Sequence, residues 1–178
     1  MRLPLLLVPA LMFLAACDTP TPARLGPDGK PLPRVYRIAN GQEARIQYEM
    51  LDAVNALRQA SGATPVQLDP RLNAAAATHS RDMANQNRPW HFGSDGSSPI
   101  DRVRRVGYYG AMLGENISET YETEIETLSA WMEQPDTREV VLDRRAQDLG
   151  FAWHQEPNGK IWWTLLMGGG IPATTPGS

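Results

Sequence analysis

The stretch that decides the fold is LGFAWHQEPNGKIWWTLLM, residues 149–167. It contains two runs rich in apolar and aromatic residues, 149–154 and 161–167, and the segment between them includes Asn158-Gly159. An Asn-Gly pair between two apolar runs is a strong signal for a tight hairpin turn. We therefore predict two antiparallel strands here, with a third strand at 115–118 in the sequence ENIS.

Upstream of the hairpin the sequence favours helices. Residues 46–58 carry apolar side chains at helical spacing, and the glycine that follows them is typical of a helix end. An Asp-Pro pair opens a second helix over 69–86, and a Ser-Pro pair opens a short third helix over 98–107. A Thr-x-x-Glu capping box begins a fourth helix at 123–134, and a brief helical turn is expected at 139–142. Helices on both sides of a small antiparallel sheet predict an α+β fold, a three-layer α-β-α sandwich.

The same patterns predict the direction of individual side chains. Trp162 and Trp163 fall on opposite faces of their strand, so one ring is expected in the core and the other near solvent. In the short third helix we expect Ile100, Val103 and Val106 to face the core.

Composition limits the classes of function. The chain has 178 residues, 42% hydrophobic and 21% charged, and its formal net charge is −3. This length suits one domain with a sizeable core, and we expect a monomer. Without an excess of basic residues, nucleic acid is not an expected partner. A single cysteine excludes an internal disulfide, and the sequence motifs of zincin proteases, α/β-hydrolases and P-loop proteins are absent.

The two ends of the chain differ from its middle. Residues 1–17 consist of a positive charge, a short apolar run and Leu-Ala-Ala-Cys, which is typical of a secretory signal and too short for an ordinary transmembrane helix. Residues 18–41 are rich in proline and favour an extended tether, and residues 168–178 (GGGIPATTPGS) favour a flexible tail. The globular domain is therefore expected at 42–167.

The end of the signal resembles the lipobox of bacterial lipoproteins. In that family the cysteine, here Cys17, is diacylated and becomes the mature N-terminus, and the acyl chains hold the protein on a membrane. The resemblance implies a lipid-anchored protein on the periplasmic side. Asp18 resembles an inner-membrane retention signal, and the outer membrane is the alternative. A buried cysteine behind an ordinary cleaved signal is the alternative for Cys17 itself.

Taken in order, several stretches of the middle resemble the CAP superfamily of cysteine-rich secretory, antigen 5 and pathogenesis-related 1 proteins, specifically its disulfide-free bacterial branch. The resemblance implies the same three-layer fold. It rests on the helix around Trp131 and on these stretches: LDAVNALRQASGATPVQLDPRL (51–72), AAAATHSRDMA (74–84), WHFGSDGSSPIDRVRRVGY (90–108), GENIS (114–118), LGFAW (149–153) and IWWTLLM (161–167).

The resemblance also implies a cleft. Members of the superfamily hold two histidines and two glutamates there, and in some members this tetrad binds a divalent metal. His91 matches the first histidine and Glu115 in GENI matches the first glutamate. Thr137 occupies the place of the second histidine. Gln134 stands in the place of the second glutamate, with Glu133 one residue away.

Zinc is the cofactor that this resemblance allows, but the sequence disfavours it. A zinc site needs about three protein ligands, and His91 and Glu115 supply two. Glu133 or Asp136 is a candidate for the third, whereas the hydroxyl of Thr137 is a poor zinc ligand. With or without a metal, we expect His91 and Glu115 to lie together, either as a hydrogen-bonded clasp or as a catalytic pair.

Three further residues match positions of the family. His79 lies on the apolar stripe of the second helix, and we expect it to pack in the core or to form the cleft wall. Asn55 and Arg58 are expected to tie the first helix to neighbouring loops by hydrogen bonds.

These observations lead to three hypotheses for function. The leading one is a lipid-anchored envelope module that binds a lipid or cell-wall ligand in the cleft without catalysis. The second is a protease-like hydrolase, with or without metal assistance, in which His91 acts as a base that Glu115 orients. The third is a structural spacer whose cleft is inert.

Overall fold

The computed structural model of the chain describes residues 35–170. The signal with Cys17, the tether as far as residue 34 and the tail from residue 171 lie outside this range. No helix of residues 35–170 combines the length and the apolar character that crossing a membrane requires.

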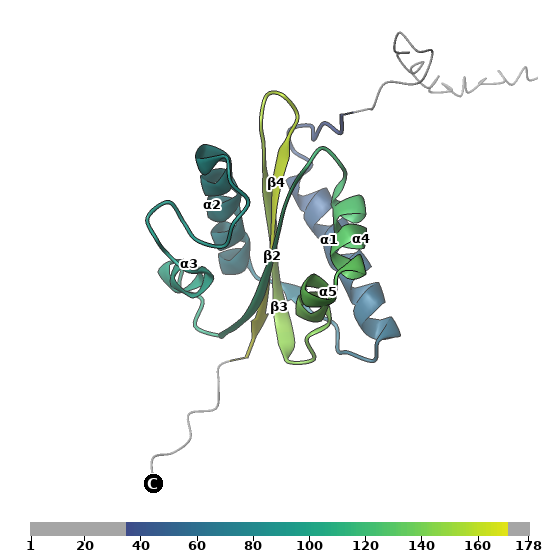
Figure 1. The fold of residues 1–178 in the computed structure, drawn as a ribbon. Coiled ribbons are helices and arrows are strands. Elements are labelled where there is room, and N and C mark those ends of the chain that lie inside the picture. The colour runs from purple at the N-terminus through teal and green to yellow at the C-terminus, as the bar shows by residue number, and fades with distance from the viewer. Residues whose placement is uncertain (1–34, 171–178) are drawn as a thin grey trace, which may run out of the picture. The chain divides into compact units, whose positions relative to one another are not determined.

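The described residues form five helices and four strands, which Figure 1 shows as a sheet between two helical layers. Helices α2 and α3 cover one face of the sheet, and α1, α4 and α5 cover the other (Figure 1). This arrangement confirms the predicted three-layer α+β sandwich. In chain order the elements are α1 (Glu43–Ala60), β1 (Gln67–Leu68), α2 (Pro70–Gln86), α3 (Pro99–Arg105), β2 (Ala111–Thr120), α4 (Glu124–Glu133), α5 (Pro135–Leu142), β3 (Ala146–Gln155) and β4 (Ile161–Gly169).

The sheet has the strand order β1-β3-β4-β2. β4 pairs antiparallel with β3 and with β2, which confirms the three predicted strands and the hairpin. The Asn-Gly turn closes as expected, because Gly159 takes φ +99° and its N–H donates to the carbonyl of Glu156. β1 pairs parallel with β3 and was not predicted, since its two residues are too few to show a period.

Side-chain caps mark the starts of α2, α3 and α4. The side chain of Asp69 accepts hydrogen bonds from the first two N–H groups available in α2, and Ser98 and Thr123 each form a capping box. α5 begins at Pro135 rather than at residue 139, because proline is well placed in the first turn of a helix. β4 extends through Gly169, so the first two residues of the expected tail are strand residues.

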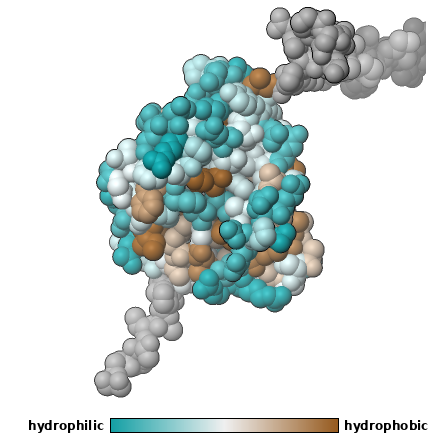
Figure 2. Space-filling model, viewed as in Figure 1, coloured by the Kyte–Doolittle hydropathy of each residue, from teal (hydrophilic) through white to brown (hydrophobic). Residues whose placement is uncertain are grey.

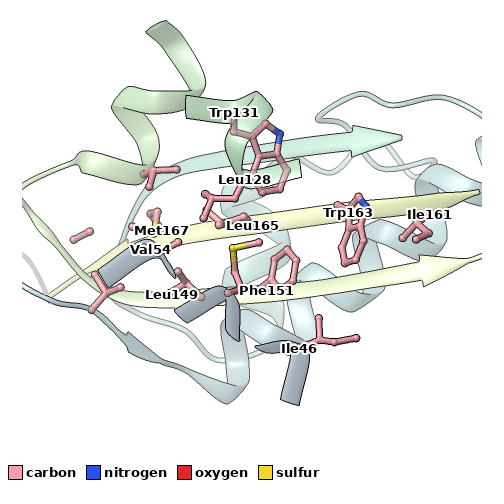
Figure 3. Close-up of a cluster of buried hydrophobic side chains, with 14 residues drawn as sticks. Ile46, Val54, Leu128, Trp131, Leu149, Phe151, Ile161, Trp163, Leu165 and Met167 are labelled. Carbon is pink, nitrogen blue, oxygen red and sulfur yellow. The ribbon is translucent and has the colours of Figure 1, made fainter. Parts of the chain in front are cut away.

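Both tryptophans of β4 are fully buried, so the prediction that one ring lies near solvent was wrong. Trp163 stacks on Phe151 with ring centroids 5.4 Å apart, in the core between the sheet and α1 and α4 (Figure 3). Trp162 lies on the opposite face, and its indole N–H donates to Glu156. Successive side chains of a strand point to opposite faces of the sheet. Because helices cover both faces here, both tryptophan side chains are buried.

The predicted hydrogen bonds of α1 are confirmed. The guanidinium of Arg58, fully buried, donates to the carbonyls of Thr64, Val141, Asp143 and Ala146 at 2.8 to 3.2 Å. Asn55 exchanges two hydrogen bonds with the backbone of Val66. These side chains hold α1 to the connection before β1 and to the segment between α5 and β3.

The end of the expected tether packs on the domain. The N–H of Tyr36 donates to the carbonyl of Tyr121, and the side chain of Gln155 donates to the carbonyl of Tyr36. Arg37 donates to the carbonyl of Pro157 in the hairpin turn. The chain therefore enters the domain beside the β3-β4 hairpin.

Candidate functional site

Glu115 is the centre of the candidate site. It lies on β2, and only 2% of its side chain is exposed. Its Oε1 lies 2.8 Å from Nδ1 of His91, and its Oε2 accepts a 2.6 Å hydrogen bond from Arg102. The structure thus brings together the histidine and the glutamate that the sequence pointed to. Both carboxylate oxygens have partners.

Arg102 is a site residue that the sequence analysis missed. It lies on α3 and is buried, and its Nη1 donates to the carbonyls of His91 and Ser97 at 2.8 and 3.1 Å. The guanidinium therefore fixes the loop before α3 to β2. The expectation that Ile100 faces the core was wrong, because it is 48% exposed and Arg102 takes the inward position beside Val103.

A signal for this orientation exists in the sequence. Two sets of positions fit one face of this helix equally well by spacing: 99, 102, 103 and 106, or 100, 103 and 106. The set that contains Arg102 buries a charged side chain, so it could be preferred only if an acidic partner for this arginine were known.

His79 lies behind Glu115 and is fully buried. Its Nε2 lies 3.0 Å from the carbonyl of Trp90, which can only accept, so this nitrogen carries the proton. The same nitrogen lies 3.7 Å from Oε1 of Glu115. Burial lowers the pKa of His79, and the carboxylate of Glu115 opposes this effect. His79 is thus a neutral inner support of the site.

His91 presents one ring nitrogen to the surroundings. Its Nδ1 faces a carboxylate and acts as the donor, which leaves the lone pair of Nε2 to accept a proton or a hydrogen bond. The side chain is 53% exposed. His91 is therefore the most exposed member of the Glu115 cluster.

An open groove of about 290 Å³ runs beside His91, between α3 and β2. A second groove of about 480 Å³ adjoins it and shares Ile100 and Met112. Figure 2 shows hydrophobic surface over α3 and towards β2. Polar and apolar side chains line the first groove, among them His91, Ser98, Ile100, Met112, Leu113 and Glu115.

The other sequence-derived cleft residues lie in the opposite helical layer. Glu133 is exposed at the end of α4, and Gln134 is exposed at the start of α5. The hydroxyl of Thr137 donates to the carbonyl of Trp131 at 2.5 Å, and its own carbonyl accepts from Asn116. None of these three side chains lines the groove beside His91.

Comparison with known proteins settles the family. The family model described as "CAP: Cysteine-rich secretory protein family" matches residues 51–167, more than half of the chain. The chain belongs to this family. The matched range of the CAP domain contains His79, His91, Arg102 and Glu115, together with β1, β2, β3 and all but the last two residues of β4.

The chain is also similar to a bacterial protein over most of its length. YkwD of Bacillus subtilis, an uncharacterised protein, is 29% identical over 120 residues, which are 67% of this chain and 46% of YkwD. This CAP chain therefore spans about half the length of that relative.

Solved structures share the fold. An outer surface protein of Borrelia burgdorferi matches with a TM-score of 0.66 and 15% identity, covering 77% of this chain and 99% of that one. An extracellular SCP-domain protein of Bacillus anthracis matches with a TM-score of 0.64 and 21% identity, covering 82% and 44%. At these identities the likeness concerns the fold alone.

The residues of this CAP site do not fit a zinc ion. Among residues 35–170 no group of three or more His, Cys, Asp or Glu side chains is arranged to hold a metal. Both oxygens of Glu115 are hydrogen-bonded, and one of them faces the positive charge of Arg102 at 2.6 Å. A cation bound to this carboxylate would have to displace His91 and lie against a guanidinium.

Proposed function

We propose that this chain is a lipid-anchored protein of the bacterial envelope whose CAP domain binds a ligand beside His91 without catalysing a reaction. The observation that carries the proposal is the double engagement of Glu115 by Arg102 and His91. A carboxylate with both oxygens in short hydrogen bonds holds the wall of a groove and is poorly placed to bind a metal or transfer a proton.

The groove indicates the class of ligand. Ile100, Met112 and Leu113 supply apolar surface, and Nε2 of His91 supplies a hydrogen-bonding atom at one side. Mostly apolar sites with a few placed polar groups bind small molecules that carry both characters. A lipid or a cell-wall component with an apolar part meets this description.

The location belongs to the same proposal. The N-terminal sequence favours export and acylation of Cys17, and two structural neighbours are an outer surface protein and an extracellular protein. We therefore place the CAP domain on the outer side of the inner membrane, and Asp18 favours retention there over the outer membrane.

One observation favours the hydrolase alternative. A carboxylate that accepts from Nδ1 of a histidine and leaves Nε2 exposed is the arrangement of a general base. The hydroxyl in this groove belongs to Ser98, whose oxygen is engaged with Asp101 as the cap of α3. Arg102 also offsets the negative charge of Glu115, which would otherwise stabilise a protonated His91. The alternative therefore needs water as its nucleophile.

Native mass spectrometry of the full chain purified from its own host tests the binding proposal, because it detects retained ligands. We expect a bound lipid or wall fragment that is lost in Ile100→Ser and reduced in His91→Ala. Ile125→Ser is the matched control, since Ile125 is similarly exposed on α4 in the opposite layer. Equal retention by all three variants would contradict the proposed groove.

Two assays address the remaining parts. Cleavage of a peptide library by the full chain, abolished by Glu115→Gln, would favour the hydrolase over the binding module. Labelling with a palmitate analogue should disappear in Cys17→Ser. Labelling that persists in this variant would refute the acylated anchor.

A further inference from the structure

A cavity of about 350 Å³, lined mostly by residues with polar side chains, lies between α2 and the loop that leads from His91 to α3. One wall is a face of α2 on which Thr78, Arg81, Asp82 and Asn85 share the helical spacing of neighbours. The loop before α3 and the helix α3 itself form the facing wall. This cavity is separate from the groove of the proposed function.

The facing wall is held in place by hydrogen bonds. The N–H of Gly93 donates to the carbonyl of Ser97, and the N–H of Ser94 donates to the carboxylate of Asp82 at 2.7 Å. Asp95 accepts from the N–H of Ser97 and forms an ion pair with Arg105. The loop is therefore a fixed wall joined to both helices.

The acidic groups of the cavity are already engaged. Asp82 accepts hydrogen bonds from Ser94 and Gln86, and Asp95 accepts from Ser97 and Arg105. Hydrogen bonds from the side chain and backbone of Ser97, with Arg105, hold the pKa of Asp95 well below its usual range. Both carboxylates thus support the cavity walls.

The cavity has more hydrogen-bond donors than its own contacts use. Arg81 forms no ion pair with any residue of the described range 35–170. Arg102, whose side chain is 6% exposed, adds a buried guanidinium to the lining, and Arg105 adds another at the rim. A guanidinium carries five N–H donors, more than these contacts use. An acceptor-rich ligand would complement this lining.

We propose that the cavity between α2 and the 93–97 loop is a second binding site, which takes a small oxyanion, a phosphate or a carboxylate group, through Arg81 and Arg105. Planar guanidinium groups bind both kinds of oxyanion with paired hydrogen bonds. This proposal does not rest on ligand binding in the groove beside His91, so one of the two proposals can be refuted without the other.

Isothermal titration calorimetry of the purified full chain in detergent tests this site with inorganic phosphate and, separately, with citrate. The ionic strength is held constant with sodium chloride. We expect saturable binding of at least one anion. Binding of phosphate alone would identify a phosphoryl source, and binding of citrate alone a carboxylate source.

Variants give the decisive comparison. Arg81→Gln should weaken binding about tenfold, as expected for loss of a charge-assisted hydrogen bond. Arg104→Gln, on α3 but outside the cavity lining, should bind as the parent does. Thermal unfolding verifies that each variant is folded. Absence of saturable heat, or equal weakening by Arg81→Gln and Arg104→Gln, would overturn the proposal.

Discussion

Arg102 on α3 donates a 2.6 Å hydrogen bond to Glu115 on β2, and the two side chains are only 6% and 2% exposed. This ion pair is the link between the loop that carries His91 and the edge of the sheet. Burying two charges is costly, so removing one partner destabilises a protein more than replacing both. The groove beside His91 therefore depends on this ion pair, and we expect the loss of either side chain alone to destabilise the domain.

The first prediction concerns this pair. Arg102→Met should lower the free energy of unfolding by about 3–5 kcal/mol, because the carboxylate of Glu115 remains buried without its cation. Adding Glu115→Gln to Arg102→Met should recover part of the loss. Guanidinium unfolding of the full chain measures both changes.

Arg104→Met is the control for this prediction. Arg104 lies on the same helix but is exposed, so its replacement should change the unfolding free energy by no more than about 0.5 kcal/mol. Equal losses in Arg102→Met and Arg104→Met would show that the ion pair contributes nothing.

The fold was predictable where its signals are local. Asp69-Pro70, the capping boxes and Asn158-Gly159 each determine a helix start or a turn within a few residues, and the structure has all of them. The burial of both tryptophans of β4 was not predictable from their strand. Burial on the second face depends on the helical layer that covers it, and this layer comes from distant parts of the chain.

The site was predictable only in part, for the same reason. The resemblance identified His91 and Glu115, and the structure brings them together. Arg102 was missed because its burial depends on Glu115, which lies 13 residues further along the chain. Thr137 occupies the place of a cleft histidine, but its hydroxyl bonds the backbone of α4, a contact that requires the turn between α4 and α5.

The second prediction concerns Arg58. Arg58→Lys should lower the free energy of unfolding by about 2–4 kcal/mol although the charge is kept. The ammonium group is compact, and it cannot reach four carbonyls spread over two segments, so some of them lose their partners. Arg45→Lys is the matched control, because Arg45 lies exposed on the same helix. An Arg58→Lys protein as stable as the control would refute this role.

The third prediction concerns the pH dependence of stability. Burial lowers the pKa of His79 in the folded state, so the unfolded chain binds more protons once the pH falls below about 6.5. The stability that neutral His79 contributes is therefore complete above about pH 6.5. It decreases as the pH falls from there towards the lowered pKa, by at most about 1.4 kcal/mol per pH unit.

The variant His79→Gln isolates this effect. Glutamine can still donate a hydrogen bond to the carbonyl of Trp90, but it does not titrate. The free energy of unfolding, measured from pH 7.5 to 5, should fall less steeply in His79→Gln than in the parent. His91 and His154 are present in both proteins, so parallel curves would exclude His79 as the source.

The last prediction concerns the close approach of α2 to β3. A Cβ atom added at Gly150 would lie 2.5 Å from Cβ of Leu72 and 2.7 Å from its carbonyl oxygen, and helix backbone cannot yield as a flexible side chain can. Gly150→Ala should therefore cost about 3 kcal/mol of unfolding free energy, near the upper end for overpacking. At Gly114 the added atom would meet the side chain of Val140, its two methyls at 2.6 and 2.8 Å and its Cβ at 3.1 Å, and a side chain on the short helix α5 can shift further than the backbone of α2. Gly114→Ala should cost about 1 kcal/mol, and any gain from restricting the unfolded chain is shared by both variants. If Gly150→Ala proved the milder of the two in thermal and denaturant unfolding, the packing of α2 directly on the sheet would not be what fixes this layer.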